Sequence, residues 1–210
     1  MLYNLFNSRF GRIMTRLGDL LLLQLLFVVT SLPVVTAGAG IAALYSVSKK
    51  LHTGAISVVI PSYFAAFKAN FKKATLLWLA LLASVALLFF DLRFCRTSDA
   101  PWIGAARIVF CGICAAWYLL FVYAFPLEAW FDNTIGRHLG NSIRLALSHL
   151  GTLLLVTAIH AALFILIEYA KALALLIGAS GCVYAKTHFL GKILFPEQFK
   201  KEDEEEEEED

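Results

Sequence analysis

The apolar residues of this chain fall into five long uncharged runs, at 20–35, 74–90, 108–127, 150–167 and 172–185. A helix needs about 20 apolar residues, within a range of roughly 17–25, to cross the hydrocarbon of a bilayer. Three runs reach this range, 20–35 is slightly short, and 172–185 is shorter still. No strand-like alternation is visible, and backbone polar groups inside lipid must be paired within their own segment. The pattern therefore predicts an all-α polytopic membrane helical bundle.

Composition supports this class. Hydrophobic residues make up 60% of the chain and charged residues only 16%, whereas soluble domains average about 45–50% and roughly 25%. The expected surroundings are therefore a lipid bilayer. The sequence contains no phosphate loop, no H-E-x-x-H zinc motif, no nucleophile elbow and no dinucleotide-binding turn. We expect a non-enzymatic protein with no cofactor, no metal site and no nucleic-acid partner.

The number of crossings depends on the segment that follows the first run. Pro33 should end or kink a helix near Leu32, and Thr36 is a plausible N-cap for a new helix. Small apolar residues follow, including Gly38 and Gly40, before two lysines close the segment. The segment predicts a helical hairpin whose break is formed by Pro33, Thr36, Gly38 and Gly40.

The positive charges favour a second crossing at 36–48. With the N-terminus cytoplasmic and this crossing included, only Arg93, Arg96, Arg107 and Lys171 lie outside, which leaves 14 of the 18 basic residues inside. Cytoplasmic loops carry such an excess. We therefore predict six crossings in three hairpins, with both termini cytoplasmic. Because 36–48 is short, a re-entrant or strongly tilted hairpin is the alternative.

Three segments have an apolar stripe opposite basic or polar residues, which is typical of interfacial amphipathic helices. They lie at 2–17, 60–73 and 137–149. Their role is either to anchor cytoplasmic loops at the membrane or to dock a cytoplasmic partner. The middle segment supplies the interface that we expect to face the cytoplasm, made of Phe64, Phe67, Lys68, Phe71, Lys72 and Lys73.

The C-terminal segment 200–210 holds nine acidic residues and two lysines. A block of like charges repels itself and is normally disordered. We therefore expect a helical membrane domain at 1–199 and a disordered acidic tail at 200–210. The tail is either simply solvated or binds a basic patch on a partner.

One ionisable residue lies near the middle of a predicted crossing, and ionisable groups at that depth are functional candidates. This residue, His160, shares a helical face with Thr157 and Glu168. Its role is either hydrogen-bonded packing or a proton or ligand site along a pathway. Glu128 and Asp132 follow a predicted helix bend at the inner surface, where solvated acids are expected and a coupling site is the alternative.

Small residues recur every fourth position in the last run, at Ala170, Ala174, Gly178 and Cys182. Such stripes allow helices to approach closely in lipid, so they serve either packing within the bundle or a subunit contact. Cys111 and Cys114 have the spacing of a redox or metal motif. An apolar helix does not stabilise thiolates, so helix packing is the favoured interpretation.

The chain resembles the YesL-type family of bacterial membrane proteins of unknown function. The residues that carry this resemblance are Leu32-Pro33, Thr36 with Gly38, Ala42-Ala43-Leu44-Tyr45, Phe64, Phe67-Lys68, Asn70-Phe71-Lys72, and Tyr123 with Pro126. The resemblance extends over about residues 1–195 and is most specific through Lys73. It implies a multi-pass protein of the bacterial cytoplasmic membrane.

Members of that family often lie beside genes for carbohydrate uptake and breakdown. The resemblance therefore implies an accessory component associated with an ATP-driven carbohydrate importer, whose subunits would be its partners. A self-contained small-molecule transporter and a structural or signalling membrane partner are the other two hypotheses. The resemblance supplies no catalytic residues.

Overall fold

The computed structural model describes residues 9–55, 58–97 and 103–199, and all regular structure in these ranges is helical. This confirms the predicted all-α class. The elements are α2 (Arg9–Ser31), the 3-10 turn η1 (Val34–Thr36), α3 (Ala37–His52), α4 (Val59–Thr97), α5 (Ile103–Trp130), α6 (Ile135–Ser148), α7 (Leu150–Tyr169), α8 (Lys171–Leu173), the π-helical turn η2 (Ala174–Gly178) and α9 (Ala179–Leu194). The predicted acidic tail lies outside the described residues.

Five stretches among the described helices are long and apolar enough to cross a membrane. They are Ile13–Ser31, Val59–Leu87, Ile108–Trp130, Leu150–Tyr169 and Lys171–Leu194. The chain is thus a multi-pass membrane protein, as its apolar runs predict. The predicted crossing at 36–48 is not among the five, because its helix α3 has only 16 residues.

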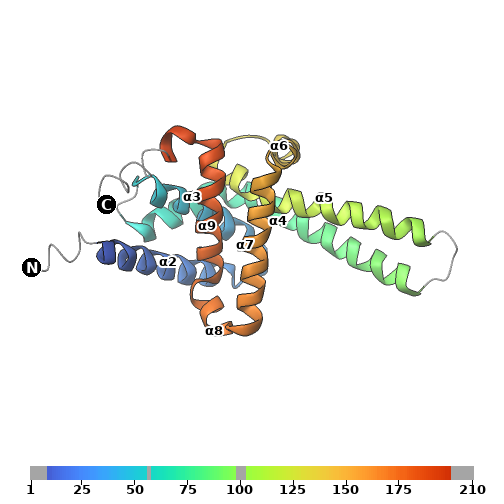
Figure 1. Cartoon of the computed structure of the whole chain (residues 1–210), viewed down its shortest axis with the longest axis horizontal. Helices are drawn as coiled ribbons and strands as arrows, with labels where there is room; N and C mark the ends of the chain where they lie inside the picture. Colours follow the sequence, from blue (N-terminus) through green and yellow to red (C-terminus); the bar gives the residue numbers. More distant parts are fainter. Residues whose placement is uncertain (1–8, 56–57, 98–102, 200–210) are drawn as a thin grey trace, which may run out of the picture.

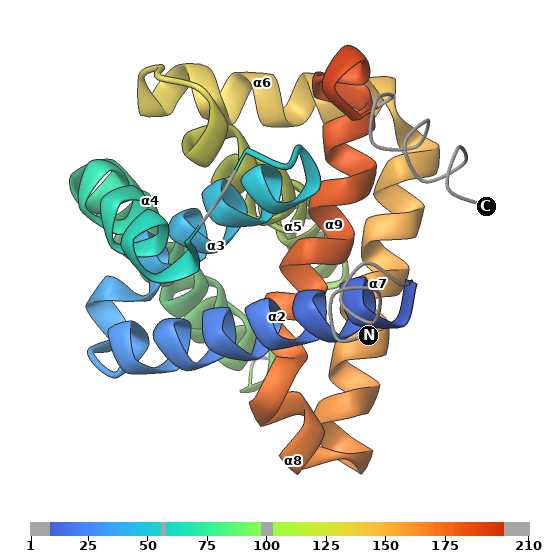
Figure 2. The same ribbon diagram turned by 90° about the vertical axis from the view of Figure 1, so that its left-hand side faces the viewer.

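Two pairs of helices dominate the shape (Figure 1). The pair α4–α5 projects from one side of the molecule, and the pair α7–α9 runs across that direction. Helix α6 caps one end of the second pair, and α2 passes close to its middle (Figure 2). The helices therefore do not form a simple parallel bundle.

Helix α4 joins two segments that the sequence analysis treated separately. The predicted surface helix at 60–73 and the predicted crossing at 74–90 form one continuous helix of 39 residues. After Pro61 in its first turn, α4 contains neither proline nor glycine, so nothing in the sequence breaks its backbone hydrogen bonds. Helix α2 likewise joins part of the first amphipathic segment to the first apolar run.

The central element is α3, which contacts α2, α4, α5 and α9. Eleven of its residues are buried, and many are small. A Cβ atom on Gly38 would lie 2.3 Å from Cβ of Trp78 and 2.5 Å from the carbonyl oxygen of Ala74. Only glycine permits this approach of α3 to α4.

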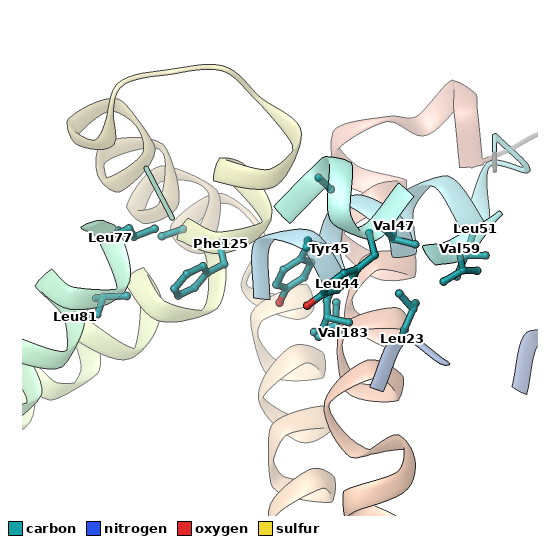
Figure 3. Close-up of a cluster of buried hydrophobic side chains, with 14 residues drawn as sticks. Leu23, Leu44, Tyr45, Val47, Leu51, Val59, Leu77, Leu81, Phe125 and Val183 are labelled. Atoms are coloured by element: carbon teal, nitrogen blue, oxygen red, sulfur yellow. The ribbon is translucent and has the colours of Figure 1, made fainter. Parts of the chain in front are cut away.

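The main core forms around α3. Leu44, Tyr45 and Val47 of this helix pack with Leu23 of α2 and Val183 of α9 (Figure 3). Leu77, Leu81 and Phe125 extend the same cluster toward the base of the α4–α5 pair. A short helix can therefore be the most buried one, because its neighbours surround it on several sides.

Candidate functional site

A lysine lies buried where α3, α5, α7 and α9 meet. Lys186 of α9 is only 6% exposed. Its Nζ atom lies 3.1 Å from Nε2 of His160 on α7 and 5.2 Å from the centre of the Tyr45 ring on α3. No carboxylate among the described residues forms an ion pair with it. Placing a cation in such surroundings is costly, so this is the strongest candidate site that the structure contains.

The hydrogen bonds around Lys186 form a connected series of side chains, in which each donor and acceptor can be assigned. The lysine amine is a donor, so Nε2 of His160 accepts and the ring proton sits on Nδ1. Nδ1 lies 3.0 Å from the carbonyl oxygen of Val156, to which it donates, and 3.3 Å from the hydroxyl of Tyr118. Tyr118 donates to Thr157 at 3.2 Å, and Thr157 donates to the carbonyl oxygen of Leu153 at 2.8 Å.

This chain disperses the positive charge of the lysine toward two backbone carbonyl oxygens. It also ties α5, α7 and α9 together at one level. Chemically, it can relay a proton or hold Lys186 in a single position, because hydrogen bonds in such a chain polarise one another. We call these four residues, Lys186, His160, Tyr118 and Thr157, the interior chain.

The predicted pathway residues are only partly brought together. Thr157 and His160 belong to the interior chain, whereas Glu168 is exposed near the end of α7. From the sequence, Lys186 was expected among the cytoplasmic charges, and Tyr118 was not a candidate. The residues on both sides of Lys186 are largely apolar, and the last candidate crossing extends to Leu194. This pattern could have indicated that Lys186 lies inside a crossing.

The residues of the predicted hairpin break have structural contacts. Thr36 lies at the N-cap position of α3, but its side chain donates to the carbonyl oxygens of Thr30 at 2.6 Å and Pro33 at 2.8 Å. The hydroxyl therefore closes the turn between α2 and α3 and does not cap α3. Gly40 lets α3 approach Phe27 and Ser31 of α2, just as Gly38 lets it approach α4.

The predicted cytoplasmic interface lies along the first half of α4. Phe64, Lys68, Phe71 and Lys72 are exposed, while Phe67 is partly buried and stacks on Tyr63. The last member of the set, Lys73, pairs with a carboxylate described next. The exposed members form a basic and aromatic surface on α4, and a docking role would require such a surface.

A second group of charges lies where α5 ends and α6 begins. Lys73 forms an ion pair with Asp132, and this hydrogen bond lowers the pKa of the Asp132 carboxyl. Deeper in, Oε2 of Glu128 lies 3.1 Å from Nε2 of His138, and both side chains are almost fully buried. These two atoms are not aligned for a hydrogen bond, so they interact only through their charges and their short separation. Burial lowers the pKa of His138, and the charge on Lys73 lowers it further.

The remaining predicted features are the small-residue stripe of the last crossing and the cysteines of α5. Two members of the small-residue stripe pack within the molecule: Gly178 lies against Leu163 of α7, and Cys182 is buried in α9. Cys111 is exposed and Cys114 partly buried, and both are free thiols. No group of three or more potential metal ligands occurs within the described part of the chain.

Comparison with known protein families gives a match in the first half of the chain. Residues 20–92 are similar to the family described as "Protein of unknown function, DUF624". The matched segment runs from the middle of α2 through α3 to near the end of α4, so it includes the central helix and the Gly38 contact. No curated protein and no solved structure matches the chain.

Proposed function

We propose that this multi-pass protein is a non-enzymatic accessory component of carbohydrate uptake by an ATP-driven importer of the bacterial cytoplasmic membrane. The proposal rests on the YesL-type resemblance and on one structural observation. The outer part of the α4–α5 pair projects beyond the other helices (Figure 1) and exposes large apolar side chains, including Leu87, Ile108 and Val109. A projecting apolar hairpin offers a lateral surface to another membrane subunit.

Mild detergent extraction followed by affinity capture tests this function. We expect importer subunits to be recovered with the wild-type protein. Ile108→Trp should abolish this recovery because a bulky ring disrupts a close helix contact. Leu154→Trp places the same ring on the exposed surface of α7 and should leave the recovery unchanged. Recovery of the wild-type protein alone contradicts the accessory role.

We also propose six crossings with both termini cytoplasmic. Support comes from the distribution of basic residues and from the burial of α3, which is compatible with a short return crossing. Among the counted basic residues whose burial the structure describes, Lys186 is the buried one, and the count favours six crossings without it. Reporter fusions after Lys50 and after Lys73 should both give a cytoplasmic signal, and a periplasmic signal at either position contradicts this topology.

A self-contained small-molecule transporter is the second candidate, and the interior chain is the observation that favours it. Ionisable residues inside membrane helices mark proton relays and substrate pathways, and Lys186 with His160 is such a pair. The discriminating measurement is uptake into vesicles that contain this protein alone. Uptake that disappears in Lys186→Met supports the transporter, and absence of uptake across sugars and small anions supports the accessory role.

A further inference from the structure

We propose that a cleft beside α6 binds a phosphate group, presented either by a free phosphate compound or by the headgroup of an anionic lipid. This binding site is separate from the interior chain and does not depend on the proposed uptake role. The site combines an open volume, a guanidinium and histidine nitrogens that lack hydrogen-bond partners.

The cleft has a volume of about 320 Å³ and lies between the end of α5, the polar side of α6 and the end of α9. This volume accommodates a phosphate with a small substituent. Its polar lining comes from Asn133, His138, Asn141, Arg144, Ser148 and His149. The remaining lining is apolar, and no acidic residue belongs to it.

Unused hydrogen-bonding groups border the cleft. His138 is 1% exposed, and neither of its ring nitrogens makes a hydrogen bond of good geometry, although Glu128 lies 3.1 Å from Nε2 and the backbone of Asn133 lies close enough to raise the pKa of the ring. Nδ1 of His149 is likewise buried and has no hydrogen-bond partner. A buried polar atom without a partner costs about 1–3 kcal/mol, and a bound ligand that supplies the partner removes that cost. These atoms therefore point to an occupant with hydrogen-bonding oxygens.

The charges identify that occupant as an anion. Arg144 contributes a guanidinium, whose planar set of donors matches the oxygens of phosphate. Two carboxylates lie nearby, but each has another neighbour. Asp132 is paired with Lys73, and Glu128 faces Nε2 of His138 from α5. The surface that an occupant would touch is thus positive or neutral.

The position of α6 favours contact with phosphate at the membrane surface. Ile143 and Leu147 are exposed on this helix, and Leu150 is exposed at the start of α7. An amphipathic helix with such an apolar side lies at the level of the lipid headgroups. Arg144 and Asn141, on the polar side of the same helix, then lie at the depth where lipid phosphates and soluble phosphates are both accessible.

Two probes separate the sources of the phosphate. Inorganic phosphate is titrated calorimetrically into the full-length protein in an uncharged detergent, with chloride at the same ionic strength as the reference. In parallel, the protein is reconstituted in equal parts of phosphatidylcholine and phosphatidylglycerol, extracted again, and assayed by mass spectrometry for retained phosphatidylglycerol. Binding of the first probe identifies a free phosphate ligand, and retention of the lipid alone identifies a headgroup ligand.

Three variants locate the binding. Arg144→Gln should weaken phosphate binding or lipid retention by at least about tenfold, since a hydrogen bond to a charged group contributes roughly 1.5–3 kcal/mol. Arg137→Gln removes the same charge from an exposed position of α6 outside the cleft and should change binding by less than about twofold. Ser148→Trp keeps Arg144 and fills the cleft, so it should abolish binding. Unfolding midpoints confirm that each variant is folded.

The proposal is overturned by any of three results. Neither probe binds the wild-type protein, or both arginine variants weaken binding equally, or Ser148→Trp binds as the wild type does. The second result assigns the effect to general surface charge. The third places the bound group outside the cleft.

Discussion

Two histidines, His160 in the middle of α7 and His138 near the start of α6, have opposite surroundings. In the interior chain, His160 accepts from Lys186 through Nε2, and its Nδ1 lies within hydrogen-bonding distance of Val156 and Tyr118. At the edge of α6, His138 is more deeply buried, yet neither of its nitrogens has an aligned partner. Burial alone does not distinguish the two regions. The difference lies in whether the polar atoms are already satisfied by the protein.

This comparison separates two uses of buried polar groups. A complete hydrogen-bonded chain fixes the positions of helices, because each donor finds an acceptor on a neighbour. An incomplete set beside an open volume leaves free energy that only a ligand can recover. The interior chain therefore ties three helices together whichever function it serves, whereas the α6 cleft has the properties of a binding site.

The largest expected effect comes from removing one partner of the interior chain. His160→Leu removes one of the two side chains that accept a hydrogen bond from the buried ammonium of Lys186, the other being Tyr45, and losing a hydrogen bond to a charged group typically costs about 1.5–3 kcal/mol. The double variant His160→Leu, Lys186→Met removes both polar groups and should recover most of that loss. Unfolding in mixed micelles at increasing denaturing detergent measures the three free energies.

Arg137→Gln controls for the effect of a surface substitution, which is usually within about 0.5 kcal/mol. A double variant as unstable as His160→Leu would show that the two residues are not coupled, and the distinction between satisfied and unsatisfied regions would then fail. A stable double variant has a second use. It allows transport and importer association to be measured without the buried charge.

An intermediate effect is expected from adding a methyl group at the tight contact between α3 and α4, compared with an open position on α6. Gly38→Ala forces a methyl group against Trp78 and the backbone of Ala74, and such overpacking typically costs about 1–3 kcal/mol. Gly140→Ala on α6 meets no atom within 4 Å and should stabilise its helix by roughly 0.5–1 kcal/mol. Unfolding midpoints of the pair measure the contrast. If both substitutions changed the unfolding midpoint equally and in the same direction, the contrast between a tight contact at Gly38 and open space at Gly140 would be wrong.

Part of this structure follows from the sequence for simple physical reasons. Long uncharged runs must be helices in lipid, so the all-α class and the repeated crossings were predictable. The turn at Pro33 was predictable as well, because proline interrupts a helix. The predicted amphipathic segment 137–149 coincides closely with helix α6. The cleft that Asn141, Arg144 and Ser148 line was not predicted.

The contacts between helices were not predictable from local patterns. The position of Lys186 depends on four helices meeting, and its charge alone suggested a residue at the membrane surface. The role of Thr36 depends on the carbonyl oxygens at the end of α2, so the N-cap rule gave the right position and the wrong hydrogen bond. The need for glycine at position 38 becomes clear only from the position of Trp78 on α4. The sequence alone does not show which helix a small residue faces.

The smallest expected effect is a dependence of stability on pH, caused by His138 beside the α6 cleft. Burial and the charge on Lys73 lower the pKa of His138 below its usual 6.5, although Asp132 acts in the opposite direction. The unfolded chain therefore binds a proton as the pH falls below about 6.5, while the folded protein does not. Stability should decrease over this range, and His138→Gln should reduce the decrease. Unfolding midpoints at several pH values measure it.

Phosphate should modify this dependence if it occupies the cleft. An anion beside His138 favours the protonated imidazole, so saturating inorganic phosphate should diminish the loss of stability as the pH falls. Glu128 faces the same ring from α5, so Glu128→Gln is measured in parallel to remove its contribution. A phosphate effect that persists undiminished in His138→Gln would show that the anion acts elsewhere. The α6 edge would then resemble the interior region, with polar groups that shape the fold and bind nothing.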